Sequence, residues 1–163
     1  MSTLYEELEC VRNYFHIQQL RFGERINFEL NVDSGVQNML LPGMLLQPLI
    51  ENAVIHGVKE IVEGAFVGVC VSSRNSVLYL TVEDNGKGFK DEQMEELLND
   101  DFFPSKTIMK KTHLGLVNAK KRIEILYGKS ANFYIESTED VGTLITISIN
   151  IDESALISNV EHS

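Results

Sequence analysis

The 163-residue chain has few cysteines, few basic residues and no long apolar run, and each shortage excludes a class of protein. Cys10 and Cys70 lie far apart in no CxxC pattern, so no zinc or dithiol site is indicated and reduced thiols are expected. The 14 Lys and Arg against 24 Asp and Glu give a net charge of −10, which argues against nucleic acid or an anionic membrane as partner. No uninterrupted apolar run is long enough to span a bilayer, and the N-terminus is acidic, unlike a signal peptide.

Hydrophobic periodicity predicts one mixed domain of ordinary size. Apolar residues at helical spacing predict helices over 4–22, 44–57, 91–100 and 114–128, with Gly23, Gly57 and Gly128 as stops. Alternation predicts strands over 26–32, 66–73, 76–84, 131–137 and 142–151, with a hairpin near residues 74–75. Because helices and strands come in mixed runs and adjacent strands are joined by short turns, we expect an α/β (α+β) two-layer sandwich, in which helices cover one face of a mixed, mainly antiparallel sheet.

The helix that contains LIENAVIHG, residues 49–57, carries three polar side chains within an apolar run. Asn52 and His56 border the apolar half of the helical wheel, and Glu51 points about 100° further round. An amide oxygen suits a hard cation, and a carboxylate can accept a proton from a reacting hydroxyl or imidazole. The alternative is that these residues are the solvated rim of an amphipathic helix.

A second cluster, VEDNGKGF at residues 82–89, directly follows a predicted strand. Gly86 and Gly88 allow the backbone to approach a ligand, and Asp84 can accept a hydrogen bond from an exocyclic amine. Asp-Asn-Gly is also ordinary turn chemistry, and the chain contains no GxxxxGK[ST] phosphate loop. The segment therefore indicates a ligand loop only in combination with other motifs.

Two further segments say little by themselves. THLGLVN, residues 112–118, marks the point where irregular chain becomes helix, and amides at a helix N-terminus can hold phosphate. VGTL, residues 141–144, places Gly142 and Thr143 at the start of a strand.

In this order, the four segments resemble the ATP-binding domain of the GHKL superfamily, which histidine kinases, gyrase-type topoisomerases, mismatch-repair ATPases and the large heat-shock chaperones share. ENAVIHG is similar to the N box, DNGKGF to the first glycine box, HLGLVN to the second, and GT to the final strand motif. The wider segments YFHIQQLRFGERINFELNVD and LLPGMLLQPLIENAVIHG resemble the LytS-type sensor histidine kinases of two-component systems. The resemblance covers residues 5–150.

The resemblance implies ATP and Mg²⁺ as cofactors. It makes Asn52 the Mg²⁺ ligand, Glu51 the residue that orients or activates the nucleophile, and His56 a residue near the phosphates. Asp84 would read the adenine amino group, with Thr143 beside it. The other implied nucleotide contacts are glycines that give the nucleotide room and residues at the start of the last helix: Gly86, Gly88, Leu114, Gly115, Leu116 and Asn118.

One basic loop and one unusual residue belong to the same implied site. SKTIMKK, residues 105–111, brings Lys106, Lys110 and Lys111 together in an irregular stretch. Such a stretch is either a solvated loop or a lid that orders over the triphosphate. His113 stands where the second glycine box of the family usually begins with glycine. Its side chain would narrow the lid hinge or reach a phosphate.

No histidine of the chain has the HFLFN-like context of a phosphoacceptor, and His16 is interpreted as structural. The resemblance therefore implies the catalytic part of a longer sensor. Residues 1–24 would be a helix from the end of the dimerisation and histidine region, 25–152 the ATP-binding domain, and 153–163 a flexible tail. The partners implied are the phosphoacceptor region of the same protein, a response regulator and, at full length, a second copy in a homodimer. The implied location is a cytoplasmic domain of a membrane-anchored sensor.

The function predicted is that of a protein histidine kinase core that transfers the γ-phosphoryl of ATP to a histidine outside this chain. Two alternatives remain open. One is a regulatory module with weak or no nucleotide binding, an idea that His113 supports. The other is a serine kinase of the anti-sigma type, which shares the nucleotide boxes.

Overall fold

A computed structural model describes residues 1–99 and 113–151. The helices are α1 (Leu4–Phe22), α2 (Leu46–Glu51), α3 (Asp91–Leu98) and α4 (Leu114–Tyr127), with a π-helical segment at Asn52–Val58 and 3₁₀ turns at Gly23–Arg25 and Gly128–Ser130. The strands are β1 (Ser2–Thr3), β2 (Ile26–Val32), β3 (Leu40–Leu41), β4 (Ala65–Arg74), β5 (Val77–Asp84), β6 (Ala131–Thr138) and β7 (Gly142–Asn150).

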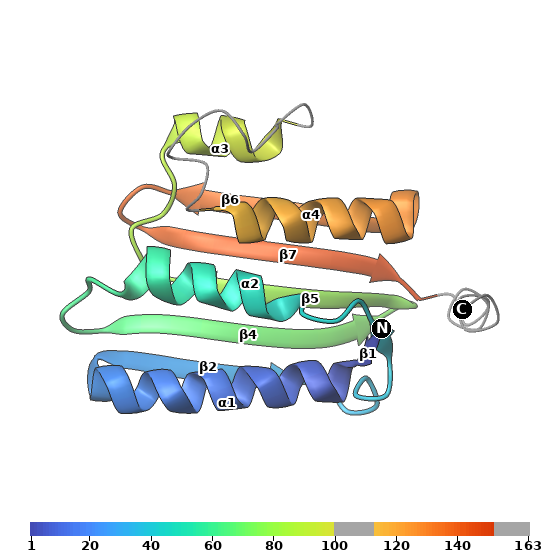
Figure 1. The fold of residues 1–163 in the computed structure, drawn as a ribbon, viewed down its shortest axis with the longest axis horizontal. Coiled ribbons are helices and arrows are strands. Elements are labelled where there is room, and N and C mark those ends of the chain that lie inside the picture. Colours follow the sequence, from blue (N-terminus) through green and yellow to red (C-terminus); the bar gives the residue numbers. More distant parts are fainter. Residues whose placement is uncertain (100–112, 152–163) are drawn as a thin grey trace.

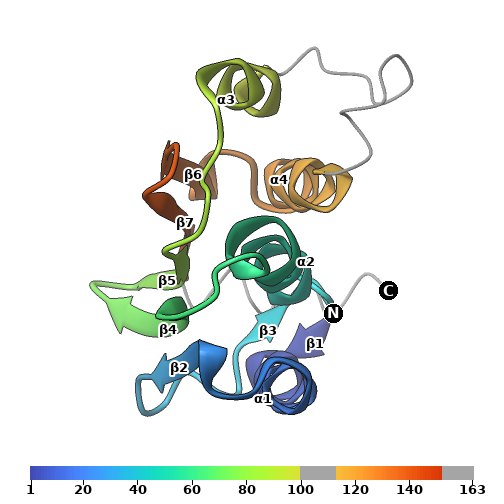
Figure 2. The ribbon, with the colours of Figure 1, turned by 90° about the vertical axis from the view of Figure 1, so that its left-hand side faces the viewer.

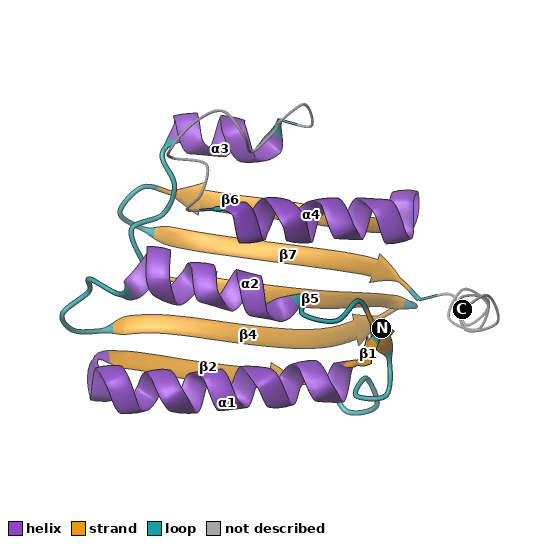
Figure 3. Ribbon diagram, viewed as in Figure 1, coloured by secondary structure: helices purple, strands orange, loops and turns teal. Residues whose placement is uncertain are grey.

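The main sheet has five strands in the order β2-β4-β5-β7-β6 (Figures 1 and 3). β2 pairs with β4 in parallel, and the other three pairings are antiparallel. Figure 2 shows α1, α2 and α4 side by side over one face of this sheet. The predicted fold class, a mixed and mainly antiparallel sheet covered on one face by helices, is confirmed.

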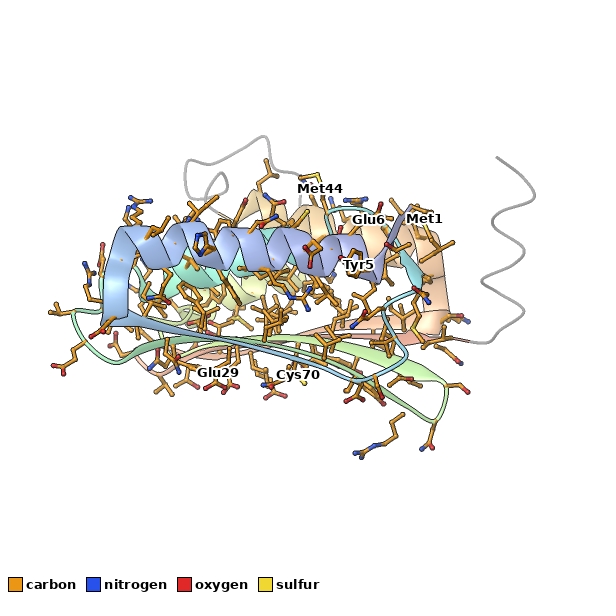
Figure 4. The ribbon with its side chains drawn as sticks, turned by 90° about the horizontal axis from the view of Figure 1, so that it is seen from below. Met1, Tyr5, Glu6, Glu29, Met44 and Cys70 are labelled. Atoms are coloured by element: carbon orange, nitrogen blue, oxygen red, sulfur yellow. The ribbon has the colours of Figure 1, made fainter. Side chains whose placement is uncertain are left out.

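The core lies between the sheet and this helical layer because each element buries one apolar face. In α1 the buried residues Leu4, Leu8 and Val11 recur at helical spacing, and the helix begins with a capping box between Thr3 and Glu6. Figure 4 shows that, in the part of the chain that the structure describes, no helix covers the opposite face of the sheet. None of the helices in the described ranges is both long and apolar enough to cross a membrane.

The second helix ends at Val58, one residue beyond the predicted stop at Gly57. The helix continues beyond α2 as the π-helical segment, and Gly57 lies inside that segment. Gly57 is needed for a different reason: a Cβ atom there would lie 2.8 Å from Asp84 Oδ1. The glycine thus allows the helix to pack directly against the end of β5, and widened π turns of this kind are frequent at functional sites.

Candidate functional site

The π-helical segment, the end of β5 and the start of β7 meet around a small cavity. Asp84 of β5 and Thr143 of β7 are register partners, so their side chains are neighbours on the sheet. The cavity has a volume of about 100 Å³ and is lined by residues from four parts of the chain: Asn52, His56, Gly57, Asp84, Lys87, Gly88, Phe89, Gln93, His113 and Thr143. A second cavity of about 220 Å³ adjoins it and shares His56, Gly57 and Lys87.

Asp84 is the most strongly perturbed acid of this site. Only 6% of its surface is exposed, and its Oδ1 accepts a hydrogen bond of 2.8 Å from the backbone N–H of Gly86. Burial raises the pKa of Asp84 to about 6, with the Gly86 N–H opposing the rise and Glu83 adding to it. A buried carboxylate with so few donors is suited to accept a further hydrogen bond from a ligand.

Asn52 and His113 contact each other across the cavity. Asn52 is 6% exposed, and its Oδ1 lies 3.2 Å from His113 Nδ1. The His113 ring packs edge-on against Phe89 at 4.7 Å and against His56 at 5.1 Å between ring centroids. Burial, with His56 and Lys87 as further causes, lowers the pKa of His113 to about 4, so the imidazole is neutral at pH 7. With the amide oriented this way, His113 Nδ1 carries the proton and its N–H donates a hydrogen bond to Asn52 Oδ1.

Thr143 and the two loop glycines, Gly86 and Gly88, are fixed by contacts within the protein. Thr143 is 5% exposed, and its hydroxyl lies 2.8 Å from Ser137 Oγ. A Cβ on Gly86 would lie 2.5 Å from Gly57 Cα, and one on Gly88 (φ +64°) would lie 2.8 Å from the carbonyl carbon of Thr138. The missing side chains of both glycines thus face protein backbone, which lets the loop pack closely against its neighbours.

The cavity includes six of the predicted site residues: Asn52, His56, Asp84, Gly88, His113 and Thr143. Gly86 lines the adjoining cavity. Others lie elsewhere: the half-buried Glu51 accepts a hydrogen bond of 2.9 Å from Gln47, and Leu116 is buried in the core. Leu114, Gly115 and Asn118 belong to α4 and line neither of these two cavities, and Lys106, Lys110 and Lys111 lie outside the described residues.

Sequence reasoning missed five residues of the site, one of which, Gly57, lines the cavity but was interpreted only as a helix stop. Lys87, Phe89 and Gln93 line the cavity, and Ser137 Oγ accepts the backbone N–H of Phe89 at 2.8 Å. Lys87 and Phe89 lie within or beside the glycine loop, so their closeness to the predicted residues was a usable signal. Nothing in the sequence pointed to Gln93 or Ser137, because their positions depend on how α3 and β6 approach the loop.

The polar side chains of the cavity fit a magnesium nucleotide chemically, but the cavity itself is too small to hold one without a rearrangement. A neutral amide oxygen suits Mg²⁺, which is commonly held by few protein ligands, and a buried carboxylate suits an exocyclic amine. Small-molecule sites usually have volumes of roughly 300–1,000 Å³, so the cavity around Asp84 is too small alone. A nucleotide would need the adjoining cavity or a shift of His113 as well.

The two-layer fold, in which the helix that carries Asn52 faces Asp84 at a strand end, is the fold of histidine kinase catalytic domains. Residues 41–153 match the family described as histidine kinase-, DNA gyrase B- and HSP90-like ATPase, and the chain belongs to that family. The resemblance found in the sequence is thereby confirmed.

Several relatives are named as sensor proteins. The chain is 31% identical over 147 residues to the sensor histidine kinase YesM of Bacillus subtilis (strain 168), and 34% identical over 147 residues to the sensor protein LytS of Staphylococcus haemolyticus (strain JCSC1435). Each match covers 90% of this chain but only 23% and 24% of the relatives, so the chain spans about a quarter of their length. The solved catalytic domain of histidine kinase ThkA shares the fold, with a TM-score of 0.66, 18% identity, and coverage of 94% of this chain and 96% of that one.

Proposed function

We propose that this chain is the ATP-binding kinase core of a two-component sensor histidine kinase. The observation that carries the proposal is the cavity in which two buried polar side chains from separate motifs, Asn52 and Asp84, lie together. Burying such groups away from ligands costs free energy, which argues for a binding role. The γ-phosphoryl of ATP would pass to a histidine outside this chain, and from there to an aspartate of a response regulator. At full length the protein would be a homodimer and this part its cytoplasmic domain.

Within the proposed site each side chain has a separate task. Asp84 accepts a hydrogen bond from the adenine amino group, and Thr143 beside it limits how the base can tilt. Asn52 holds Mg²⁺, which neutralises phosphate charge, and this is the main requirement of phosphoryl transfer. His56, whose pKa is lowered mainly by burial, is a neutral hydrogen-bonding group near the phosphates. Glu51 lies next to Asn52 in the chain but outside the cavity, and its proposed task is to orient or activate the nucleophile. The start of α4 would meet the phosphates, as would Lys106 and Lys110, which lie outside the described residues.

A second candidate function is a regulatory module with weak nucleotide binding. The observation that favours it is the contact between His113 and Asn52, because the amide oxygen proposed as metal ligand already has a partner. The two functions differ in a measurable way, since only the kinase core requires tight, Mg²⁺-dependent binding.

Asn52→Ala is expected to weaken Mg²⁺-ATP binding by about tenfold or more, because it removes the proposed protein ligand of the metal. Calorimetric titration with ATP, in Mg²⁺ and in EDTA, measures this directly. Asn132→Ala, at an exposed position of β6, is the matched control and should bind like the unaltered chain. Transfer of labelled phosphate to a separately made phosphoacceptor fragment then tests the kinase activity. Equal binding in Mg²⁺ and EDTA by the unaltered chain would favour the regulatory module.

His113→Ala is expected to tighten Mg²⁺-ATP binding about 2- to 10-fold, because it frees Asn52 Oδ1 from a hydrogen bond of ordinary net strength. The same titration measures it, and ATP binding in EDTA should change less. Weaker binding in His113→Ala would mean that the imidazole contacts the nucleotide instead of competing with the metal.

A further inference from the structure

Glu7 of α1 is a buried charge outside the cavity. The buried polar or charged residues in the described part of the chain are Glu7, Asn52, Asp84 and Thr143. Three of these line the cavity, whereas Glu7, only 5% exposed, lies near the start of α1. A buried carboxylate requires compensating donors, so its partners indicate what it does.

The Glu7 carboxylate holds the backbone where α2 begins. Its Oε1 accepts the N–H of Met44, and its Oε2 accepts those of Leu45 at 3.0 Å and Leu46 at 3.1 Å. Ser2 Oγ lies 3.4 Å from Oε1 as a weaker fourth donor. The first amides of a helix have no partner within the helix, so this side chain from another helix serves as the cap of α2.

The backbone at Met44 is shaped to fit the carboxylate. Met44 has a φ of +59°, which is unusual for a non-glycine residue, and Leu45 follows in the right-handed helical region. Successive residues of opposite hand turn their N–H groups toward one point and form a concave anion site. Here the anion bound by these N–H groups is the Glu7 carboxylate. Its hydrogen bonds stabilise the strained backbone of Met44, and that backbone in turn supplies the donors for the carboxylate.

A short strand pair joins the segment before α1 to the segment before α2, close to the Glu7 carboxylate. β1 pairs with β3 through Ser2 with Leu41 and Thr3 with Leu40, and the N–H of Leu4 donates to Met39 O at 2.7 Å. Figure 2 shows α1, β1, β3 and α2 gathered on one side of the molecule. Figure 4 shows Met44 and the first turns of α1 at the same end of the molecule.

The Glu7 clamp, in which the carboxylate accepts the N–H groups of Met44, Leu45 and Leu46, lies one short helix away from the metal ligand proposed above. From Leu46 the chain continues as helix to Asn52, which at 1.5 Å per residue is roughly 9 Å. Buried Leu49 and Ile50 keep this helix against the core. A change in its first turn would therefore not detach the helix but would shift it along or about its own axis. Because the Asn52 oxygen must meet a cation with tight geometry, such a shift would be felt there first.

We propose that Glu7 is a positioning residue for the nucleotide site: it fixes the start of α2 and thereby sets the place of Asn52. The inference rests on the proposed nucleotide binding. It makes α1, which precedes the matched family residues 41–153, a working part of the site. Groups that hold a metal ligand in position typically change metal affinity 10- to 100-fold when altered.

The test is Glu7→Gln in the 163-residue chain, alone and combined with Asn52→Ala. Gln keeps the size but places an N–H₂ group against backbone donors. We expect Mg²⁺-ATP binding about tenfold weaker, binding in EDTA changed less than about twofold, and no further loss in the Asn52→Ala background. Glu9→Gln makes the same charge change at a half-exposed position of α1, where the carboxylate pairs with Arg12 of the same helix, and should bind normally. If Glu7→Gln does not fold, Glu7→Asp, which keeps the charge but shortens the reach, provides the same comparison.

Two results would overturn the inference. One is unchanged Mg²⁺-ATP binding by a folded Glu7 variant. The other is a loss that is equal in Mg²⁺ and EDTA and that persists in the Asn52→Ala background, which is what general destabilisation would give. Failure of the unaltered chain to bind ATP under either condition is distinguishable from both, since it would overturn the proposed function and the inference with it.

Discussion

Asp84→Asn is expected to make the domain more stable and its nucleotide binding much weaker. At pH 8 the buried carboxylate is ionised, and a pKa of about 6 against an ordinary value of 3.8 means that folding disfavours this charge. At about 1.4 kcal/mol per pKa unit, removing the charge should raise the free energy of unfolding by about 1–3 kcal/mol. ATP affinity should fall about 10- to 150-fold, because a hydrogen bond to a charged acceptor is replaced by one to an amide.

The pH dependence of stability follows from the same raised pKa. Between pH 6 and 4 the folded Asp84 binds a proton that the unfolded chain does not yet bind, so its contribution stabilises the fold as the pH falls. Above pH 6 this stabilisation is lost. The stability difference between Asp84→Asn and the unaltered chain should therefore be largest above pH 6 and shrink toward pH 4. ATP binding by the unaltered chain should weaken below pH 6, as the acceptor becomes protonated.

Urea unfolding at several pH values and titration with ATP measure the two effects. Glu136→Gln, at an exposed position of β6, removes one negative charge without affecting a buried site and is the control. A gain in stability without a loss of ATP affinity would mean that Asp84 is buried but does not contact the base. A loss of stability would show that the carboxylate has partners beyond the Gly86 N–H.

Local periodicity was enough to predict the four helices and the five strands of the main sheet, because burial follows the same repeat. It did not predict β1 and β3, which are two residues long and carry no repeat. The alternation in residues 26–32 predicted β2, and the spacing in residues 4–22 predicted α1 with its end at Gly23. The parallel pairing of β2 with β4 could not be read in this way, because pairing direction depends on how the intervening α2 and its π-helical extension cross the sheet. The role of Gly57 could not be predicted for a similar reason. A glycine is needed there because Asp84 of β5 lies too close to leave room for a side chain.

For the site, the order of the motifs predicted which residues come together at one cavity. It did not predict the contacts that fix these residues in position. Asn52, Asp84 and Thr143 come from three separate segments, and the structure brings them to one cavity. The contact of His113 with Asn52 and the clamp of Glu7 on the start of α2 join residues 61 and 37 to 39 positions apart. No periodicity or short motif encodes contacts over such separations, so only the folded structure shows them.

Gly86→Ala is expected to lower the free energy of unfolding by about 2–4 kcal/mol and to abolish nucleotide binding. The added Cβ would lie 2.5 Å from Gly57 Cα and would also overlap the Gly57 carbonyl group. Both are backbone atoms, so no change of rotamer relieves the clash. The glycine loop must therefore move away from the π-helical segment, which breaks the hydrogen bond of 3.2 Å from Lys87 N to Gly57 O.

The loss of binding in Gly86→Ala follows from the same displacement, because Asp84 lies at the root of the loop and Asn52 on the helix that the loop contacts. Gly43→Ala is the control, since a Cβ there meets nothing closer than Ser2 Oγ at 3.5 Å. Thermal unfolding followed by circular dichroism should show a fall of roughly 4–16 °C for Gly86→Ala and little change for Gly43→Ala. A Gly86→Ala protein within about 0.5 kcal/mol of the unaltered chain would mean that loop and helix can separate freely, and such freedom is incompatible with a site that requires Asp84 and Asn52 at a fixed distance.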